Sequence, residues 1–117
     1  MNQIIIVNGG TAKDVERFRA LADQAIALVE AELPGTVQYE CYVAPESSRF
    51  VWHESYADSA AILAHVQRLM TAGIPQQLPE VADFDFAFAL GEPSSEASEA
   101  LAKMGFQVMP IHAKASR

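Results

Sequence analysis

The stretch Trp52–His65, WHESYADSAAILAH, decides how the rest of the chain folds. Its first residues continue a segment in which successive side chains alternate between two faces, which predicts a strand over Arg49–Tyr56. Asp58 is a residue type that caps helices, and it precedes a helical pattern over Ser59–Thr71. The stretch therefore predicts a strand, a tight turn and a helix that carries His65.

Similar patterns predict the remaining elements. Apolar residues three and four apart indicate amphipathic helices, and alternating apolar and polar residues indicate strands. A capping box at Thr11 is expected to open the first helix. The other expected elements are a strand at Asn2–Asn8, that first helix to about Leu33, a strand at Thr36–Ala44, an irregular segment at Ile74–Asp83, a strand at Phe84–Leu90, a helix from about Ser95 to Met104 and an edge strand at Phe106–His112.

The order of these elements predicts an α+β fold. Strand, helix, hairpin, helix and strand make the βαββαβ ferredoxin-like plait, with helices on one face of an antiparallel sheet. Residues 1–90 would form this plait, and residues 91–117 would extend the same domain by a helix and an edge strand. The strand at Phe84–Leu90 puts small residues opposite its phenylalanines. An exposed sheet face of that kind suits a sheet-to-sheet dimer, and exposure to solvent is the alternative.

The composition limits the possible partners. The chain of 117 residues is 50% hydrophobic and 20% charged, with a net charge of −7. Nucleic acids require a clustered basic surface, whereas the eight Lys and Arg residues are scattered, and the negative charge also disfavours anionic lipids. Cys41 is the only cysteine, which indicates a reducing, cytoplasmic location. The expected partners are a small molecule, a second copy of the chain, or both.

Two short motifs resemble those of the antibiotic biosynthesis monooxygenase family of dimeric α/β barrels. That family typically closes its first helix on Glu-x-Gly, and here Leu33-Pro34-Gly35 stands at that place. It also shows Glu-x-Trp-x-Asp-x-x-Ala followed by His, and this chain matches with Glu54, Tyr56, Asp58, Ala61 and His65, a Tyr standing where Trp is commoner. The resemblance covers about Ile4 to Leu90. It implies a dimeric α/β barrel, and the fold hosts oxygenases, isomerases and proteins of other activities.

His65 is the first candidate for chemistry. It falls at the border of the apolar stripe of its helix, formed by Ile62, Val66, Leu69 and Met70. From there an imidazole can reach the space between helix and sheet and exchange protons near neutral pH. A histidine bonded to a backbone carbonyl at the edge of the core is the competing interpretation.

The strand before that helix supplies further candidates. Trp52, Glu54 and Tyr56 share one face, and the two aromatic residues could line a pocket, although aromatic residues at this spacing also build ordinary cores. A carboxylate among aromatic residues should be paired or strongly perturbed, either in an interface salt bridge or in catalysis. Asn8 is expected to end the first strand and enter the Gly9-Gly10 turn, while the resemblance implies a pocket asparagine.

The candidates fall into two groups. Three histidines without metal-binding spacing predict no metal site. The candidate catalytic residues are His65, Tyr56 and Asn8, and the candidate substrate-binding residues are Trp52, Tyr39, Glu54 and Phe86.

Three functional hypotheses follow. The first is a monooxygenase that uses no cofactor and oxidises a small phenolic or quinol-like aromatic molecule with O₂. The second is a non-catalytic dimer that binds a small ligand or assists assembly, with the C-terminal extension packed over a pocket mouth or exchanged between subunits. The third is an isomerase or decarboxylase on the same fold. A cavity shared by His65 with Trp52 or Tyr56 would favour the enzymes, and a packed core there would exclude them.

Overall fold

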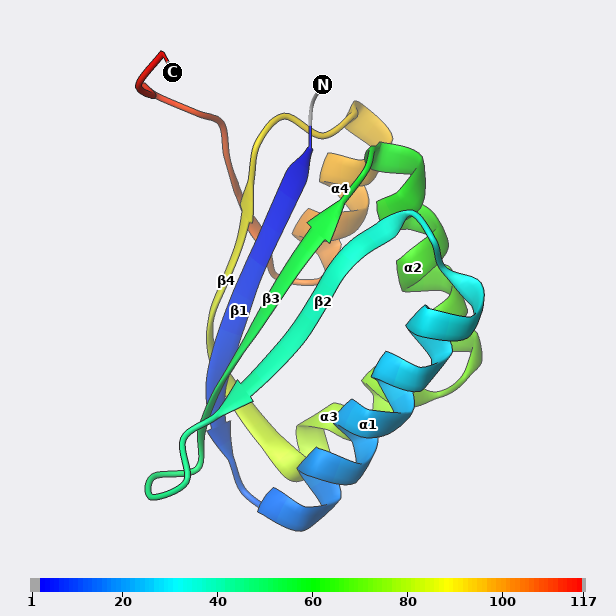
Figure 1. Cartoon of the computed structure of the whole chain (residues 1–117), viewed down its shortest axis with the longest axis vertical. Helices are drawn as coiled ribbons and strands as arrows, with labels where there is room; N and C mark the ends of the chain where they lie inside the picture. The colour runs from blue at the N-terminus through cyan, green and yellow to red at the C-terminus, as the bar shows by residue number, and fades with distance from the viewer. Residues whose placement is uncertain (1–2, 117) are drawn as a thin grey trace.

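A computed structural model of the protein describes residues 3–116. Residues 1, 2 and 117 lie outside this range, including Asn2, which the sequence places in the first strand. Within it, one five-stranded sheet has the order β2-β3-β1-β4-β5, and the helices cover one of its faces (Figure 1). The elements are β1 (Ile4–Ala12), α1 (Val15–Glu32), β2 (Thr36–Val43), β3 (Arg49–Tyr56), α2 (Ser59–Thr71), α3 (Ile74–Val81), β4 (Ala82–Leu90), α4 (Ser95–Lys103) and β5 (Gln107–Met109).

The predicted α+β fold is confirmed. β1 pairs antiparallel with both β3 and β4, and β2 pairs antiparallel with β3, as a ferredoxin-like plait requires. The expected C-terminal helix and edge strand are both present. β5 pairs with β4 in parallel, so the sheet is antiparallel except at this edge. None of the helices in residues 3–116 is long and apolar enough to cross a membrane.

The first strand does not end at Asn8, and this prediction was wrong. β1 continues through Gly9 and Gly10 to Ala12, and its register with β4 shifts between the two glycines, as in a β-bulge. A Cβ at Gly10 would lie 1.8 Å from the carbonyl oxygen of Asp83 in β4. The glycine pair therefore allows the two backbones to approach closely instead of turning the chain.

The start of α1 also differs from the prediction. Thr11 lies in β1, and the helix is capped by Asp14, whose Oδ1 accepts a hydrogen bond of 3.1 Å from the backbone N–H of Arg17. Asp14 has an extended backbone, as an N-cap residue requires. The capping residue is thus Asp14, three residues after the expected Thr11.

The segment predicted to be irregular contains a two-turn helix. α3 starts after Gly73, which has a φ of 78°, and carries Pro75 in its first turn and Pro79 in its second. Lys13 Nζ donates a 2.7 Å hydrogen bond to the carbonyl of Pro79, so α3 is tied to the start of α1. The helix places Ile74 and Leu78 over the sheet.

The core consists of two apolar clusters between sheet and helices. One includes Phe18, Phe50 and Trp52, and the other includes Ile4 and Ile62, each fully or almost fully buried. In α2, Ile62 and Leu69 are buried as expected. Met70 was predicted in the buried stripe and is instead 49% exposed.

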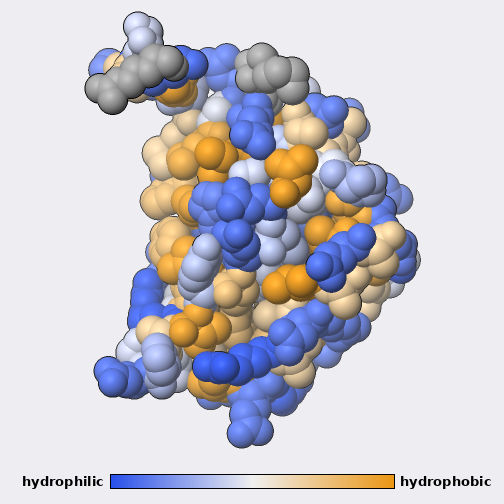
Figure 2. Space-filling model, viewed as in Figure 1, coloured by the Kyte–Doolittle hydropathy of each residue, from blue (hydrophilic) through white to orange (hydrophobic). Residues whose placement is uncertain are grey.

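The face of the sheet opposite the helices has no cover in the described chain. Alternation puts a set of partly buried apolar side chains on it: Ile5, Val7, Val51, Phe86, Phe88 and Leu90. His53 lies on this face too, opposite Val7. On the side of the molecule seen in Figure 2, apolar side chains form small groups separated by polar ones.

Candidate active site

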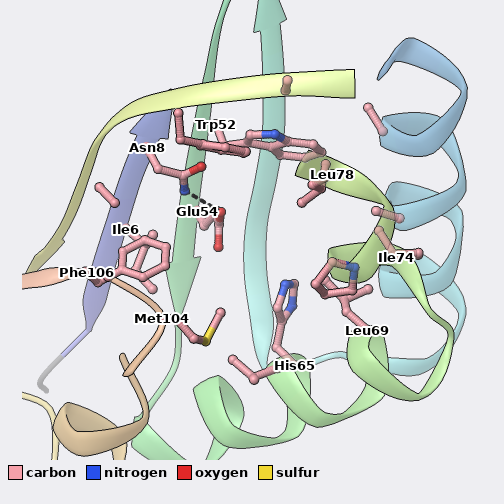
Figure 3. Close-up of a pocket in the computed structure, with 18 of the residues that line it drawn as sticks. Ile6, Asn8, Trp52, Glu54, His65, Leu69, Ile74, Leu78, Met104 and Phe106 are labelled. Carbon is pink, nitrogen blue, oxygen red and sulfur yellow. Dashed lines mark hydrogen bonds between the residues drawn. The ribbon is translucent and has the colours of Figure 1, made fainter. Parts of the chain in front are cut away.

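A cavity of about 700 Å³ lies between the helix-covered face of the sheet and the helices (Figure 3). Its walls come from both core clusters. β1 and β3 supply the sheet wall, α2 and α3 supply the opposite wall, and the segment that joins α4 to β5 supplies Met104 and Phe106. The cavity is shared, because His65, Trp52 and Tyr56 all line it.

Glu54 is the centre of a polar cluster on the sheet wall. Its Oε2 accepts a 3.1 Å hydrogen bond from Asn8 Nδ2, and its Oε1 accepts a 2.5 Å bond from the Tyr56 hydroxyl. All three side chains are buried, with exposed fractions of 8% or less. The antiparallel register of β1 and β3 explains the grouping, since Asn8 lies opposite Trp52 and therefore diagonal to Glu54.

The expectation of a paired or perturbed carboxyl at Glu54 is met on both counts. Burial raises the pKa of the Glu54 carboxyl to about 7, and the hydrogen bonds from Tyr56 and Asn8 limit that rise because they favour the charged form. Burial, together with the neighbouring Glu54, raises the pKa of the Tyr56 hydroxyl well above its usual value. Tyr56 therefore remains protonated and acts as a donor.

His65 projects from α2 into the same cavity and is only 4% exposed (Figure 3). Its Nδ1 lies 3.0 Å from Thr36 Oγ1, a side-chain partner rather than the backbone carbonyl of the competing interpretation. The ring meets Tyr39 and Tyr56 edge-on, with centroids 4.8 and 5.1 Å away. Burial lowers the pKa of His65 to about 4, so the imidazole is neutral near pH 7.

The turn before β2 brings Thr36 to His65. A Cβ at Gly35 would lie 2.7 Å from the Cβ of Ala61, so the absence of a side chain allows this turn to approach α2. Thr36 follows immediately, and His65 lies one helical turn beyond Ala61. Sequence reasoning missed Thr36, although the two small residues that position it belong to the motifs quoted above.

Aromatic side chains form the wall next to this cluster. Trp52 and Tyr39 stack with centroids 4.8 Å apart, and both line the cavity. Phe86 was expected in the same wall. Phe86 lines the cavity and pairs with Gly9, and its ring centroid lies 5.9 Å from that of Phe88, which belongs to the uncovered face of the sheet. The structure therefore does not bring the Phe86 ring to His65.

The structure adds lining residues that the sequence did not indicate. Ile74 and Leu78 come from α3, the segment expected to be irregular, and Met104 and Phe106 come from the C-terminal extension (Figure 3). In Figure 3 the two pairs lie on opposite sides of the cavity, with Glu54 between them. The extension thus contributes to the cavity wall of its own chain.

Charge within the cavity is restricted to acidic groups. The described residues that line it include no Lys or Arg. Besides Glu54, the charged lining residues are the exposed Asp83 and Asp85, which pair with Lys13 and Arg49. Residues 3–116 contain no group of three or more His, Cys, Asp or Glu side chains that could hold a metal ion.

Comparison with known proteins finds similar structures but no similar sequences. No family model matches the chain, and no curated protein sequence matches it. MupZ from Pseudomonas fluorescens superposes with a TM-score of 0.79 at 18% identity, over 100% of this chain and 96% of that one. SnoaB, a cofactor-independent oxygenase from Streptomyces nogalater, superposes with a TM-score of 0.66 at 13% identity, over 81% of this chain and 97% of that one.

A third solved structure has the same fold. A protein of Bacteroides thetaiotaomicron, provisionally described as an antibiotic biosynthesis monooxygenase, superposes with a TM-score of 0.64 at 17% identity, over 72% of this chain and 84% of that one. The match to MupZ includes α4 and β5, whereas the other two cover less of the chain. At these identities the likeness establishes the fold. The chain therefore has the fold of the antibiotic biosynthesis monooxygenases.

Proposed function

We propose that the protein is a monooxygenase that uses no cofactor and oxidises a phenolic or quinol-like aromatic molecule with O₂. The observation that carries the proposal is the aromatic-walled cavity of about 700 Å³ in which Asn8, Glu54, Tyr56 and His65 converge. SnoaB, which shares the fold, is a cofactor-independent oxygenase and supports the same assignment.

The chemistry requires little from the protein. A phenol or quinol with a free ortho or para carbon reacts with O₂ to give a quinone and water: one oxygen atom enters the ring, the other leaves as water, and the substrate supplies all four electrons. The phenolate is the form that reduces O₂. The protein must therefore bind the ring, remove the hydroxyl proton and keep water away from the radical pair.

The cavity residues are suited to these tasks. The stacked Tyr39 and Trp52 would bind a ring. With Nδ1 bonded to Thr36, His65 would use Nε2 to hold the substrate hydroxyl, and Asn8 would hold substrate or peroxide oxygen with its remaining amide hydrogen. Pockets for drug-sized ligands measure roughly 300–1,000 Å³, so the volume suits a molecule of more than one ring. The absence of Lys and Arg from the described lining favours an uncharged substrate.

An acid–base enzyme, such as an isomerase or decarboxylase, is the second candidate. It is favoured by one observation, the Glu54 pKa of about 7, because such a group is present in both protonation states at neutral pH. A non-catalytic binding dimer has less support. Burying a carboxyl group in an apolar cavity costs stability and adds nothing to the binding of an apolar ligand.

We also propose a homodimer through the uncovered face of the sheet. The apolar side chains on that face, Val7, Val51 and Phe88 among them, are only partly buried in one chain. Sedimentation velocity of wild type and of Phe88→Glu tests this proposal. A dimer that Phe88→Glu dissociates is expected, and a wild-type monomer would exclude the dimer.

Oxygen uptake tests the oxygenase. Purified protein, freed of metal and flavin, is supplied with hydroquinones, anthrones and catechols, and autoxidation is subtracted. Uptake of O₂ with one ¹⁸O atom from ¹⁸O₂ in the product is expected. Met70→Ala, an exposed change in α2, is the control and should retain the rate. No uptake on any ring would overturn the proposal and leave the acid–base enzyme.

A further inference from the structure

We propose that Glu54 is the catalytic residue that accepts the proton of the substrate hydroxyl, and that Asn8 and Tyr56 are positioning residues that hold its two oxygens. This inference rests on the proposed phenolic substrate. It changes the roles that the sequence indicated, in which His65 accepted or shared the proton and Glu54 was placed among the substrate-binding residues.

The geometry places an available acceptor in the cavity. Each carboxylate oxygen of Glu54 accepts one hydrogen bond, from Asn8 or from Tyr56. A carboxylate oxygen has room for a second, so each can also accept a substrate hydroxyl. The two donors fix the carboxylate plane at the cavity wall, and Figure 3 shows the bond from Asn8. Neither donor can take a proton itself, since one is an amide and the other is a phenol held protonated by burial.

Charge conservation in the cavity favours Glu54 over His65. Transfer to Glu54 breaks the substrate O–H bond, forms an O–H bond on the carboxyl group and moves one negative charge from carboxylate to phenolate. The cavity holds a single negative charge before and after. Transfer to His65 would instead create an imidazolium and a phenolate beside an existing carboxylate, which burial disfavours.

The acidities of the two groups agree with that comparison. Burial lowers the pKa of His65 to about 4 and raises that of Glu54 to about 7. General bases work best when their pKa lies near the operating pH. After accepting the proton, Glu54 becomes a hydrogen-bond donor and can stabilise the phenolate that it has formed.

Anaerobic binding of 4-nitrophenol tests the inference without any oxygen chemistry. The ionised probe absorbs visible light, so its spectrum reports its own charge, and calorimetry in two buffers of different ionisation heat reports proton uptake. At about pH 8, above the pKa of Glu54, wild type is expected to bind the ionised probe and take up about one proton for each bound molecule. Visible absorption combined with proton uptake means that a protein group has become protonated next to a phenolate.

Two matched variants identify that group. Glu54→Gln should lose this combination, whereas His65→Gln should keep it. Tyr56→Phe should also keep it but move the pH at which uptake is lost upward, because the removed hydrogen bond favours the charged carboxylate. Circular dichroism confirms that each variant is folded. An unchanged combination in Glu54→Gln, or its loss in His65→Gln alone, would overturn the inference.

The remaining outcomes separate this inference from the oxygenase. Failure of wild type to bind 4-nitrophenol would overturn the inference together with the phenolic substrate on which it rests. Proton uptake by Glu54 without O₂ consumption on any ring would retain the inference and overturn the oxygenase.

Discussion

Glu54→Gln is expected to change the pH dependence of stability, because burial shifts two neighbouring pKa values in opposite directions. The pKa of Glu54 rises from 4.5 to about 7 and that of His65 falls from 6.5 to about 4. A raised carboxyl pKa means that the folded state binds the proton more tightly than the unfolded state. The stabilising contribution of Glu54 is therefore complete below pH 4.5 and is lost as the pH rises through 7. That of His65 is complete above pH 6.5 and is lost as the pH falls through 4.

The two contributions are similar in size. At about 1.4 kcal/mol for each pKa unit, each shift corresponds to about 3 kcal/mol of unfolding free energy. In wild type the opposing slopes largely cancel between pH 4.5 and 6.5. The unfolding free energy of Glu54→Gln minus that of wild type should therefore increase by about 3 kcal/mol as the pH rises from 4.5 to about 7. The corresponding difference for His65→Gln should decrease by about as much as the pH rises from about 4 to 6.5.

Urea denaturation at a series of pH values measures these differences. Trp52 is the only tryptophan and lies in the cavity wall, so its fluorescence follows unfolding, and circular dichroism checks that the transition is two-state. Subtracting wild type removes the titration of surface carboxyl groups common to all three proteins. Differences that stay flat with pH, or that have the same sign for both variants, would refute the assignment of opposite shifts.

Three further changes are expected to have distinct effects. Gly10→Ala places a Cβ 1.8 Å from a carbonyl oxygen of β4 and should reduce the unfolding free energy by at least about 3 kcal/mol, measured by urea denaturation; an unchanged midpoint would contradict the close approach. Thr36→Val removes the hydrogen-bond partner of His65 Nδ1 and should cost about 1–3 kcal/mol, in contrast to Thr36→Ser, which retains the hydroxyl. Met104→Trp should slow the binding of multi-ring ligands, measured by stopped-flow fluorescence, because Met104 is 45% exposed and lines the cavity. Met70→Trp on α2 is the control. Equal binding rates in the two variants would refute a role for Met104 in ligand access.

The sequence predicted the order of the elements because their periodicities are strong, but it misplaced the end of β1. Gly9-Gly10 was interpreted as a turn, as adjacent glycines often are. In the structure both glycines lie within the strand, where they admit the neighbouring backbones of β3 and β4. That contact joins residues more than 30 positions apart, and local patterns carry no information about it.

α3 was missed for a different reason. Two prolines four residues apart argue against a helix when each is judged locally. Pro75 occupies the first turn, where its missing N–H costs nothing, and Pro79 interrupts a helix only two turns long. Packing of Ile74 and Val81 into the core, with exposed fractions of 3% and 0%, outweighs the weak local propensity.

The candidate site was predicted in part. Alternation along β3 correctly put Trp52, Glu54 and Tyr56 on one face, and helical periodicity brought His65 over that face. Phe86 lines the cavity, as predicted, but its ring lies beside Phe88 because both residues alternate with Ala87 and Ala89 along β4. Which face of β4 the helices cover is decided by tertiary packing, which the strand pattern does not reveal. The hydrogen bond between Thr36 and His65 also depends on tertiary packing, which the sequence pattern does not reveal.

The position of β1 has a consequence for synthesis of the chain. Of the five described strands it is synthesised first, yet it lies at the centre of the sheet and cannot pair until β3 and then β4 have emerged, more than 40 and 70 residues later. Its apolar run Ile4-Ile5-Ile6-Val7 combines high β-propensity with no charge, the signature of segments that associate between chains. Until Tyr56 is available, β1 therefore presents two unpaired edges, and until Leu90 is available it presents one. In cells the yield would depend on how long these intervals last and on the chaperones that shield the strand.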